Sequence, residues 1–120
     1  MSYATTILSR LPGASRWDHG LRALVETLQT YLPDEKVALV VKAYEFGERA
    51  HTGQTRKSGE PYITHPVAVA QELAEMHLDY EAVCAAILHD VVEDTPASLE
   101  EIQEHFGEDI ALIVDGVSKL

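Results

Sequence analysis

The sequence predicts an all-α domain, and three observations support this class. Apolar residues recur three or four positions apart over most of the 120-residue chain, which is the period of a helix face. Helix-breaking and helix-capping residues separate these periodic segments. No segment of useful length shows the apolar–polar alternation of a β-strand, and the sequence has no internal repeat. We therefore expect a bundle of about six helices.

Two helices are expected in the first half of the chain. Residues 1–14 predict a flexible arm that contains the breaker Pro12-Gly13. The first helix covers roughly residues 16–32, and Pro33-Asp34 separates it from a second helix that reaches about Ala50. The second helix should be well buried, because it carries two adjoining apolar rows. One row is Val37, Val40, Val41 and Tyr44, and the other is Leu39, Ala43, Phe46 and Ala50.

A loop and a third helix follow. Residues 51–60 predict a loop, because they include two glycines and show no periodicity. The third helix is expected at roughly residues 66–76. Pro61 and Pro66 favour its start, since proline fits the first helical turn.

Capping signals mark the fourth and fifth helices. Asp79 is the expected N-cap of a helix over roughly residues 80–92, which Thr95-Pro96 ends. Ser98 and Glu101 have the spacing of a capping box and therefore predict a fifth helix.

The sixth helix is the last. Gly107 ends the fifth helix, and apolar residues from Ile110 to Val117 indicate the sixth. This helix runs toward Leu120 with neither a cap nor a polar tail, so we expect the domain to be truncated there and to continue in a longer protein.

The composition limits the classes of function. The hydrophobic content of 46% is ordinary for one packed domain. The net charge of −11 argues against general binding to DNA or to an anionic membrane, but not against a small polyanionic substrate. Cys84, the single cysteine, predicts a buried free thiol and a cytoplasmic setting. We find neither a membrane span nor a signal peptide.

The most informative segment is His89-Asp90 followed by Glu93-Asp94. In a continuous helix, residues four apart lie on one face, so His89 would align with Glu93 and Asp90 with Asp94. Carboxylates this close repel one another unless a cation or water separates them. A divalent metal ion is the simplest interpretation. An ordinary polar helix end is the alternative, but the apolar flanks make it less favoured.

His65 is a second candidate metal ligand. Pro61 and Pro66 restrict the backbone on both sides of it, so its imidazole is presented on a restrained turn. Imidazole is a common metal ligand. Taken alone, His65 would more often be a satisfied, partly buried histidine, and its weight comes from the pair His89-Asp90.

Basic residues in the loop are candidates for substrate binding. Arg56-Lys57-Ser58 can stack on a base or bind phosphate, although a solvated basic loop is the ordinary alternative. Tyr62 either lines the same pocket or packs in the core. The position of His51 beside this loop leaves its role open. The remaining histidines predict surface or cap roles: His19, His77 and His105.

Three segments resemble the signature motifs of the RelA/SpoT homologues. The first is HTGQTRKSGEPYITHP at residues 51–66, the second is LHDVVEDT at residues 88–95, and the third is DGVSKL at residues 115–120. The resemblance covers roughly residues 36–120. These enzymes make and destroy the alarmones ppGpp and pppGpp in the bacterial stringent response.

The resemblance implies a fold and an activity. Residues 15–120 would be the first part of an HD-type helical bundle, the N-terminal hydrolase domain of a larger protein with synthetase and regulatory domains. The activity would be removal of the 3′-pyrophosphate of ppGpp or pppGpp. The hydrolase motif is intact in this chain, so the resemblance implies hydrolase competence.

The resemblance also implies roles for individual residues. Manganese (Mn2+) would bind His65, His89, Asp90 and a further aspartate that lies beyond Leu120. A chain that ends at Leu120 is therefore expected to have an incomplete active site.

The remaining roles concern the water and the substrate. Glu93 and Asp94 would act on the water and the pyrophosphate group. The guanine nucleotide would contact the basic loop, and the expected substrate-binding residues are Arg56, Lys57, Ser58 and Tyr62.

Two other functions stay open at this point. HD-type sites occur in many phosphohydrolases, so the substrate could be another nucleotide. A non-catalytic helical module that regulates a synthetase is the second alternative. The apolar last helix could also cause self-association into a homo-oligomer.

Overall fold

The computed structural model describes residues 20–52, 59 and 62–118. This part of the chain contains helices and no strand, which confirms the all-α class. The predicted arm at residues 1–14 lies outside it. The helices are α2 (Leu21–Leu28), α3 (Asp34–Ala50), α4 (Thr64–Glu75), α5 (Tyr80–Leu88), α6 (Val91–Asp94), α7 (Leu99–Phe106) and α8 (Glu108–Ser118).

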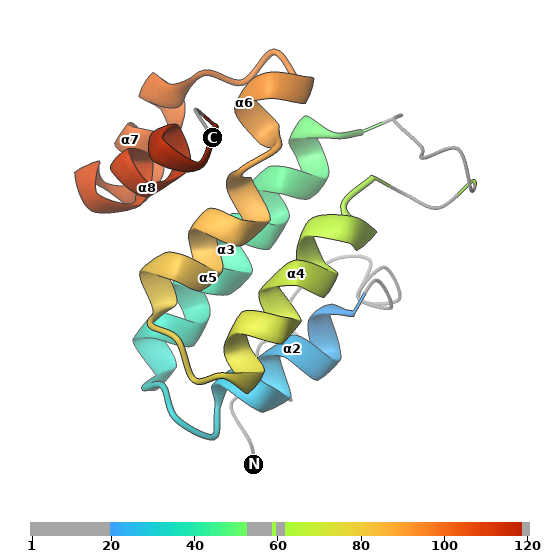
Figure 1. Cartoon of the computed structure of the whole chain (residues 1–120), viewed down its shortest axis with the longest axis vertical. Helices are drawn as coiled ribbons and strands as arrows, with labels where there is room; N and C mark the ends of the chain where they lie inside the picture. The colour runs from blue at the N-terminus through green and yellow to red at the C-terminus, as the bar shows by residue number, and fades with distance from the viewer. Residues whose placement is uncertain (1–19, 53–58, 60–61, 119–120) are drawn as a thin grey trace.

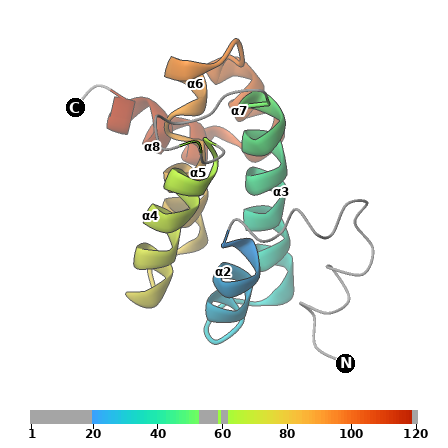
Figure 2. The same ribbon diagram turned by 90° about the vertical axis from the view of Figure 1, so that its right-hand side faces the viewer.

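Helix α5 is the centre of the bundle. It packs against α3, α4 and α8, while α2 covers α4 and α3 on one side and α7 packs on α8 (Figure 1). In both views α6, α7 and α8 gather at one end of the molecule and α2 lies toward the other (Figure 2). None of the helices described is long and apolar enough to cross a membrane.

The core follows from the apolar spacing. The first predicted row of α3 is buried, whereas the second row is mostly half-buried and only Ala43 in it is buried. Burying such side chains stabilises the fold, at roughly 25 cal/mol for each Å² of apolar surface removed from water. The largest fully buried side chains include Tyr44, Leu21, Leu24, Leu28, Ile87, Leu88, Ile102 and Ile110.

Gly47 allows a close approach at the centre. A Cβ atom at this position of α3 would lie 3.0 Å from Cδ1 of Ile63 and 3.7 Å from Cγ2 of Ile87. Glycine therefore lets α3 pack closely on α5 and holds the segment before α4 against both helices.

The capping predictions are confirmed. The amide of Ala82 donates to Oδ1 of Asp79 at 2.8 Å, which caps α5. At α7 the amide of Glu101 donates to Oγ of Ser98 at 3.2 Å, and the Glu101 carboxylate accepts from the Ser98 amide at 3.2 Å. Gly107 follows α7 with a φ of 95°, a conformation that favours glycine.

The prediction of one continuous helix over residues 80–92 is wrong. Helix α5 ends at Leu88 and α6 begins at Val91, so His89 and Asp90 form a turn between them. Nδ1 of His89 lies 2.6 Å from the carbonyl oxygen of Ala86, which in a continuous helix would accept the amide of Asp90. This competition of a side chain with the helical ladder accounts for the break.

Candidate functional site

The break between α5 and α6 brings His89 and Asp90 together. Nε2 of His89 lies 3.1 Å from Oδ1 of Asp90. The two side chains are 24% and 19% exposed, so both are largely withdrawn from water while still reachable from the surface. The predicted His-Asp pair is therefore present as a contact.

The orientation of the His89 ring places Nδ1 at the Ala86 carbonyl and leaves Nε2 as the nitrogen beside Asp90, available to bind a metal ion. A carbonyl oxygen only accepts hydrogen bonds, so the contact with Ala86 assigns the proton to Nδ1. In the neutral ring Nε2 then carries a lone pair, and this lone pair faces the Asp90 carboxylate. Two electron-rich atoms 3.1 Å apart repel unless a proton or a metal cation lies with them. This arrangement is the one in which metal-binding histidines are commonly held.

The other predicted ligand, His65, comes from a different helix. It is the second residue of α4, and its side chain is exposed. Within residues 20–52, 59 and 62–118, no three side chains of His, Cys, Asp or Glu come close enough together to hold a metal ion. The donors His89 and Asp90 fit a cation as a pair, and a ligand role for His65 stays a prediction.

The two acids of α6 differ in their contacts. Glu93 and Asp94 both have exposed side chains. Oδ2 of Asp94 accepts a hydrogen bond of 2.7 Å from the hydroxyl of Tyr62, which lies in the turn before α4. The structure therefore connects two residues that the sequence analysis assigned to different roles, one to the substrate and one to the water.

The ring of Tyr62 contacts His51, whose role the sequence leaves open. The two rings stack with their centroids 4.6 Å apart and an angle of 20° between their planes. His51 follows the last residue of α3 and is only 3% exposed. In the sequence, the position of His51 directly after a well-buried helix is the signal that could have predicted its burial. The predicted substrate-binding residues Arg56, Lys57 and Ser58 lie outside the described part of the chain.

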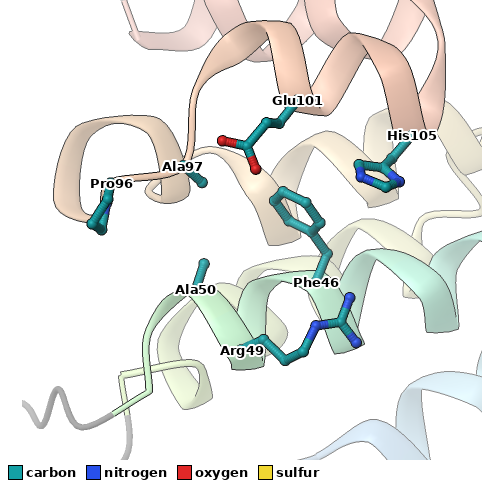
Figure 3. A pocket seen from close by; sticks show the side chains of 7 residues that line it. All are labelled: Phe46, Arg49, Ala50, Pro96, Ala97, Glu101 and His105. Atoms are coloured by element: carbon teal, nitrogen blue, oxygen red, sulfur yellow. The ribbon is translucent and has the colours of Figure 1, made fainter.

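Two hollows flank this region. One of about 540 Å³ lies between α3, α7 and the connection from α6 (Figure 3). None of the predicted site residues lines it, and the Glu101 carboxylate in its wall already belongs to the capping box. Its lining residues are Phe46, Arg49, Ala50, Pro96, Ala97, Glu101 and His105.

The second hollow has a volume of about 280 Å³ and lies between α4, α5 and α8. His89 is one of its lining residues, and the rest are apolar: Val69, Leu73, Ala82, Ala85, Ala86, Ile113 and Val117. The imidazole of His89 thus lies between this apolar hollow and the carboxylate of Asp90. The low polarity on the hollow's side strengthens the electrostatic interactions of the ring.

Comparison with known proteins gives several close relatives. The bifunctional (p)ppGpp synthase/hydrolase SpoT of Escherichia coli K12 is 56% identical over 98 residues, which are 82% of this chain and 14% of SpoT. A guanosine-3′,5′-bis(diphosphate) 3′-pyrophosphohydrolase of Haemophilus influenzae is 68% identical over 71 residues, 59% of this chain and 10% of that protein. A probable GTP pyrophosphokinase of Mycobacterium leprae is 45% identical over 100 residues, 83% of this chain and 13% of that protein.

These matches confirm the resemblance to the RelA/SpoT homologues. The chain spans only 10 to 14% of the length of the three relatives, so it corresponds to a small part of each. The family model described as HD domain matches residues 43–120, a range that contains every predicted site residue. This chain therefore belongs to the HD domain family.

Proposed function

We propose that this chain is part of a hydrolase domain that, in the longer protein, removes the 3′-pyrophosphate of ppGpp and pppGpp to give GDP or GTP. The observation that carries the proposal is the orientation of His89, whose Nε2 faces the Asp90 carboxylate at 3.1 Å. The names of the relatives supply the substrate, since several are called guanosine-3′,5′-bis(diphosphate) 3′-pyrophosphohydrolase.

An HD hydrolase domain implies a divalent metal ion, and we propose manganese held by His89, Asp90 and His65. A bound divalent ion lowers the pKa of a coordinated water and offsets negative charge on phosphate oxygens. The contact of Nδ1 with Ala86 supports the ligand role of His89, because it keeps the Nε2 lone pair directed toward Asp90.

The carboxylates of α6 handle the proton in this proposal. Asp94 or Glu93 accepts a hydrogen bond from the attacking water and takes its proton as the water oxygen forms a bond to phosphorus. The bond between phosphorus and the 3′-oxygen breaks, and the proton is delivered to the leaving ribose oxygen. Both side chains are exposed, so they can reach a substrate that approaches the break from solvent.

The remaining parts of the proposal rest on the resemblance. Arg56 and Lys57 hold the guanine nucleotide or its phosphates, and Ser58 lies in the same loop. The substrate is a bacterial nucleotide, so the reaction takes place in the cytoplasm, and synthetase and regulatory domains accompany the hydrolase in the longer protein.

The test is pyrophosphate release from ppGpp by the complete hydrolase domain of the longer protein, with and without Mn2+. We expect Mn2+-dependent release that falls at least 100-fold in Asp90→Ala and in Glu93→Ala. Asp109→Asn is the matched control, because Asp109 is an exposed carboxylate in the first turn of α8. An unchanged rate in Asp90→Ala would overturn the proposed chemistry.

Two further measurements separate the alternatives. A panel of nucleoside tetraphosphates, triphosphates and monophosphates distinguishes an alarmone hydrolase from an HD phosphohydrolase with another substrate. Calorimetric titration with Mn2+ reports on the site even where turnover is slow, and no saturable binding would favour the non-catalytic module.

A further inference from the structure

We propose that His51 and Tyr62 are positioning residues that hold the carboxylate of Asp94, the proposed acceptor of the water proton. The inference rests on the proposed function for its role in turnover. It adds His51, to which no role is assigned, and it moves Tyr62 from substrate binding to support of a neighbouring side chain.

Asp94 needs support because of where it lies. It is the last residue of α6, a helix of four residues, and its side chain is exposed. An exposed carboxylate at a helix end can populate several rotamers unless its contacts restrict it. The hydroxyl of Tyr62 donates to Oδ2 at 2.7 Å, a charge-assisted hydrogen bond that favours one of those rotamers.

Tyr62 can hold Asp94 because Tyr62 is itself held on two sides. Its ring stacks on the ring of His51 at 4.6 Å. The next residue, Ile63, is 2% exposed and packs where Gly47 leaves room, so the backbone at Tyr62 is anchored in the core. A rigid donor loses little entropy when it binds a carboxylate, and it therefore restricts the carboxylate effectively.

His51 provides the base of this arrangement. Its ring is 3% exposed, and its backbone amide donates to the carbonyl oxygen of Gly47 at 3.0 Å. The stack on His51, at the end of α3, restricts the Tyr62 ring, and the hydrogen bond from Tyr62 in turn restricts Asp94 of α6. The end of α3 and the turn before α4 together hold one carboxylate of α6.

The contacts favour positioning over substrate binding for Tyr62. Its hydroxyl already donates its single proton to Asp94, so it has none left to donate to a phosphate. A group that acts through Asp94 changes kcat with little effect on KM, whereas a group that binds the substrate equally in the ground and transition states changes KM.

The first experiment uses Tyr62→Phe, which removes the hydroxyl and keeps the ring. We expect a 10- to 50-fold loss of kcat for ppGpp, with KM and the Kd for Mn2+ within twofold of the original values. In the double variant Tyr62→Phe with Asp94→Asn the loss should equal that of Asp94→Asn alone, since the hydroxyl then has no carboxylate to hold. A large rise in KM at constant kcat, or fully multiplicative losses, would overturn the inference.

Tyr31→Phe is the matched control. The hydroxyl of Tyr31 donates to the carbonyl oxygen of Leu78 at 2.7 Å, the same length as the bond of Tyr62. This bond joins the α2–α3 and α4–α5 connections, at the end of the bundle opposite α6 (Figure 1). Tyr31→Phe should lose comparable stability and keep its rate within twofold.

His51 is tested by two substitutions of similar size. His51→Phe keeps a flat ring against Tyr62, and His51→Leu removes it. We expect a three- to tenfold loss of kcat in His51→Leu and substantial recovery of kcat in His51→Phe. Urea denaturation checks that both variants unfold at the same midpoint. Equal losses in both variants would show that stacking has no part in positioning.

A readout without turnover keeps this inference separate from the proposed function. Three-bond NMR couplings report the χ1 rotamer of Asp94, and we expect one dominant rotamer that becomes averaged in Tyr62→Phe. An unchanged rotamer distribution would overturn the inference whatever the activity. A protein that is inert toward ppGpp but shows the rotamer change would refute the proposed substrate and leave the positioning role intact.

Discussion

Nδ1 of His89 lies 2.6 Å from the carbonyl oxygen of Ala86, within the last turn of α5. This contact both interrupts the helix and fixes the direction of Nε2. A side chain held in this way needs little reorganisation to bind a cation, because its orientation is set by the fold. The hydrogen bond between His89 Nδ1 and the Ala86 carbonyl thus shapes both the turn at residues 89 and 90 and the direction of Nε2.

The first prediction concerns metal affinity. Asp90→Asn should weaken Mn2+ binding by roughly 100-fold, because an amide oxygen replaces the negative charge beside Nε2 of His89. Isothermal titration calorimetry measures the change. Glu108→Gln, an exposed carboxylate at the start of α8, should bind Mn2+ as the original chain does. Equal affinities for all three proteins would contradict the ligand role of Asp90.

The second prediction compares one substitution at two glycines. Gly47→Val should destabilise the fold by about 2 kcal/mol or more, because its methyl groups would overlap Ile63 and Ile87 in the core. Gly116→Val should be neutral or slightly stabilising, since no described atom lies within 4 Å of a Cβ there and valine has the higher helix propensity. Urea denaturation gives both free energies of unfolding. Similar values for the two variants would disprove the close approach at Gly47.

The third prediction tests the cap of α7. Ser98→Ala removes the oxygen that accepts from the Glu101 amide and should lower the free energy of unfolding by about 1 kcal/mol. Glu104→Gln on the exposed face of the same helix should change it by less than about 0.5 kcal/mol. Thermal unfolding followed by circular dichroism distinguishes the two, and equal melting temperatures would argue against the capping box.

The fourth prediction is a pH dependence. Burial, and to a lesser extent the charge of Glu81, raises the pKa of the Cys84 thiol from 9.0 to about 12. The folded chain therefore keeps the proton more tightly than the unfolded chain. This contribution to stability is complete below pH 9 and is lost as the pH rises from 9 toward 12.

The loss should approach about 1.4 kcal/mol for each pH unit in that window, and it should be absent from Cys84→Ala. The difference between the two proteins in urea titrations at pH 8 and pH 10 isolates the thiol from other groups. A thiol-specific reagent at pH 8 should react with the original chain only when it unfolds, because Cys84 has no exposed surface. Rapid reaction of the folded chain would contradict this burial.

Most of the fold could be predicted from the sequence. Apolar periodicity and capping signals located every described helix except the short α6, and Asp79 and Ser98 cap the helices that they were predicted to cap. Periodicity could not reveal the break, because Ile87 and Val91 are four apart and both are buried, as in an uninterrupted helix. The interruption comes from a polar side chain binding the backbone, a contact that carries no periodic signal.

The candidate site was predicted in part. His89 and Asp90 are adjacent in the chain, so their contact follows from local geometry. The stack of His51 on Tyr62 depends instead on how the chain returns after a loop, and loop sequences contain no repeating pattern that fixes such a return. Tyr62 was assigned to the substrate because it lies near the basic loop in the sequence, whereas its hydrogen-bond partner, Asp94, comes from a distant helix.

The turn at residues 89 and 90 has a consequence for how such a domain can change over generations. Residues before it belong to α5, whose packing supports the whole bundle, whereas Glu93 and Asp94 extend into solvent from a short separate helix. Replacing those two acids costs the scaffold little folding energy. A lineage can therefore lose these two acids and retain the architecture.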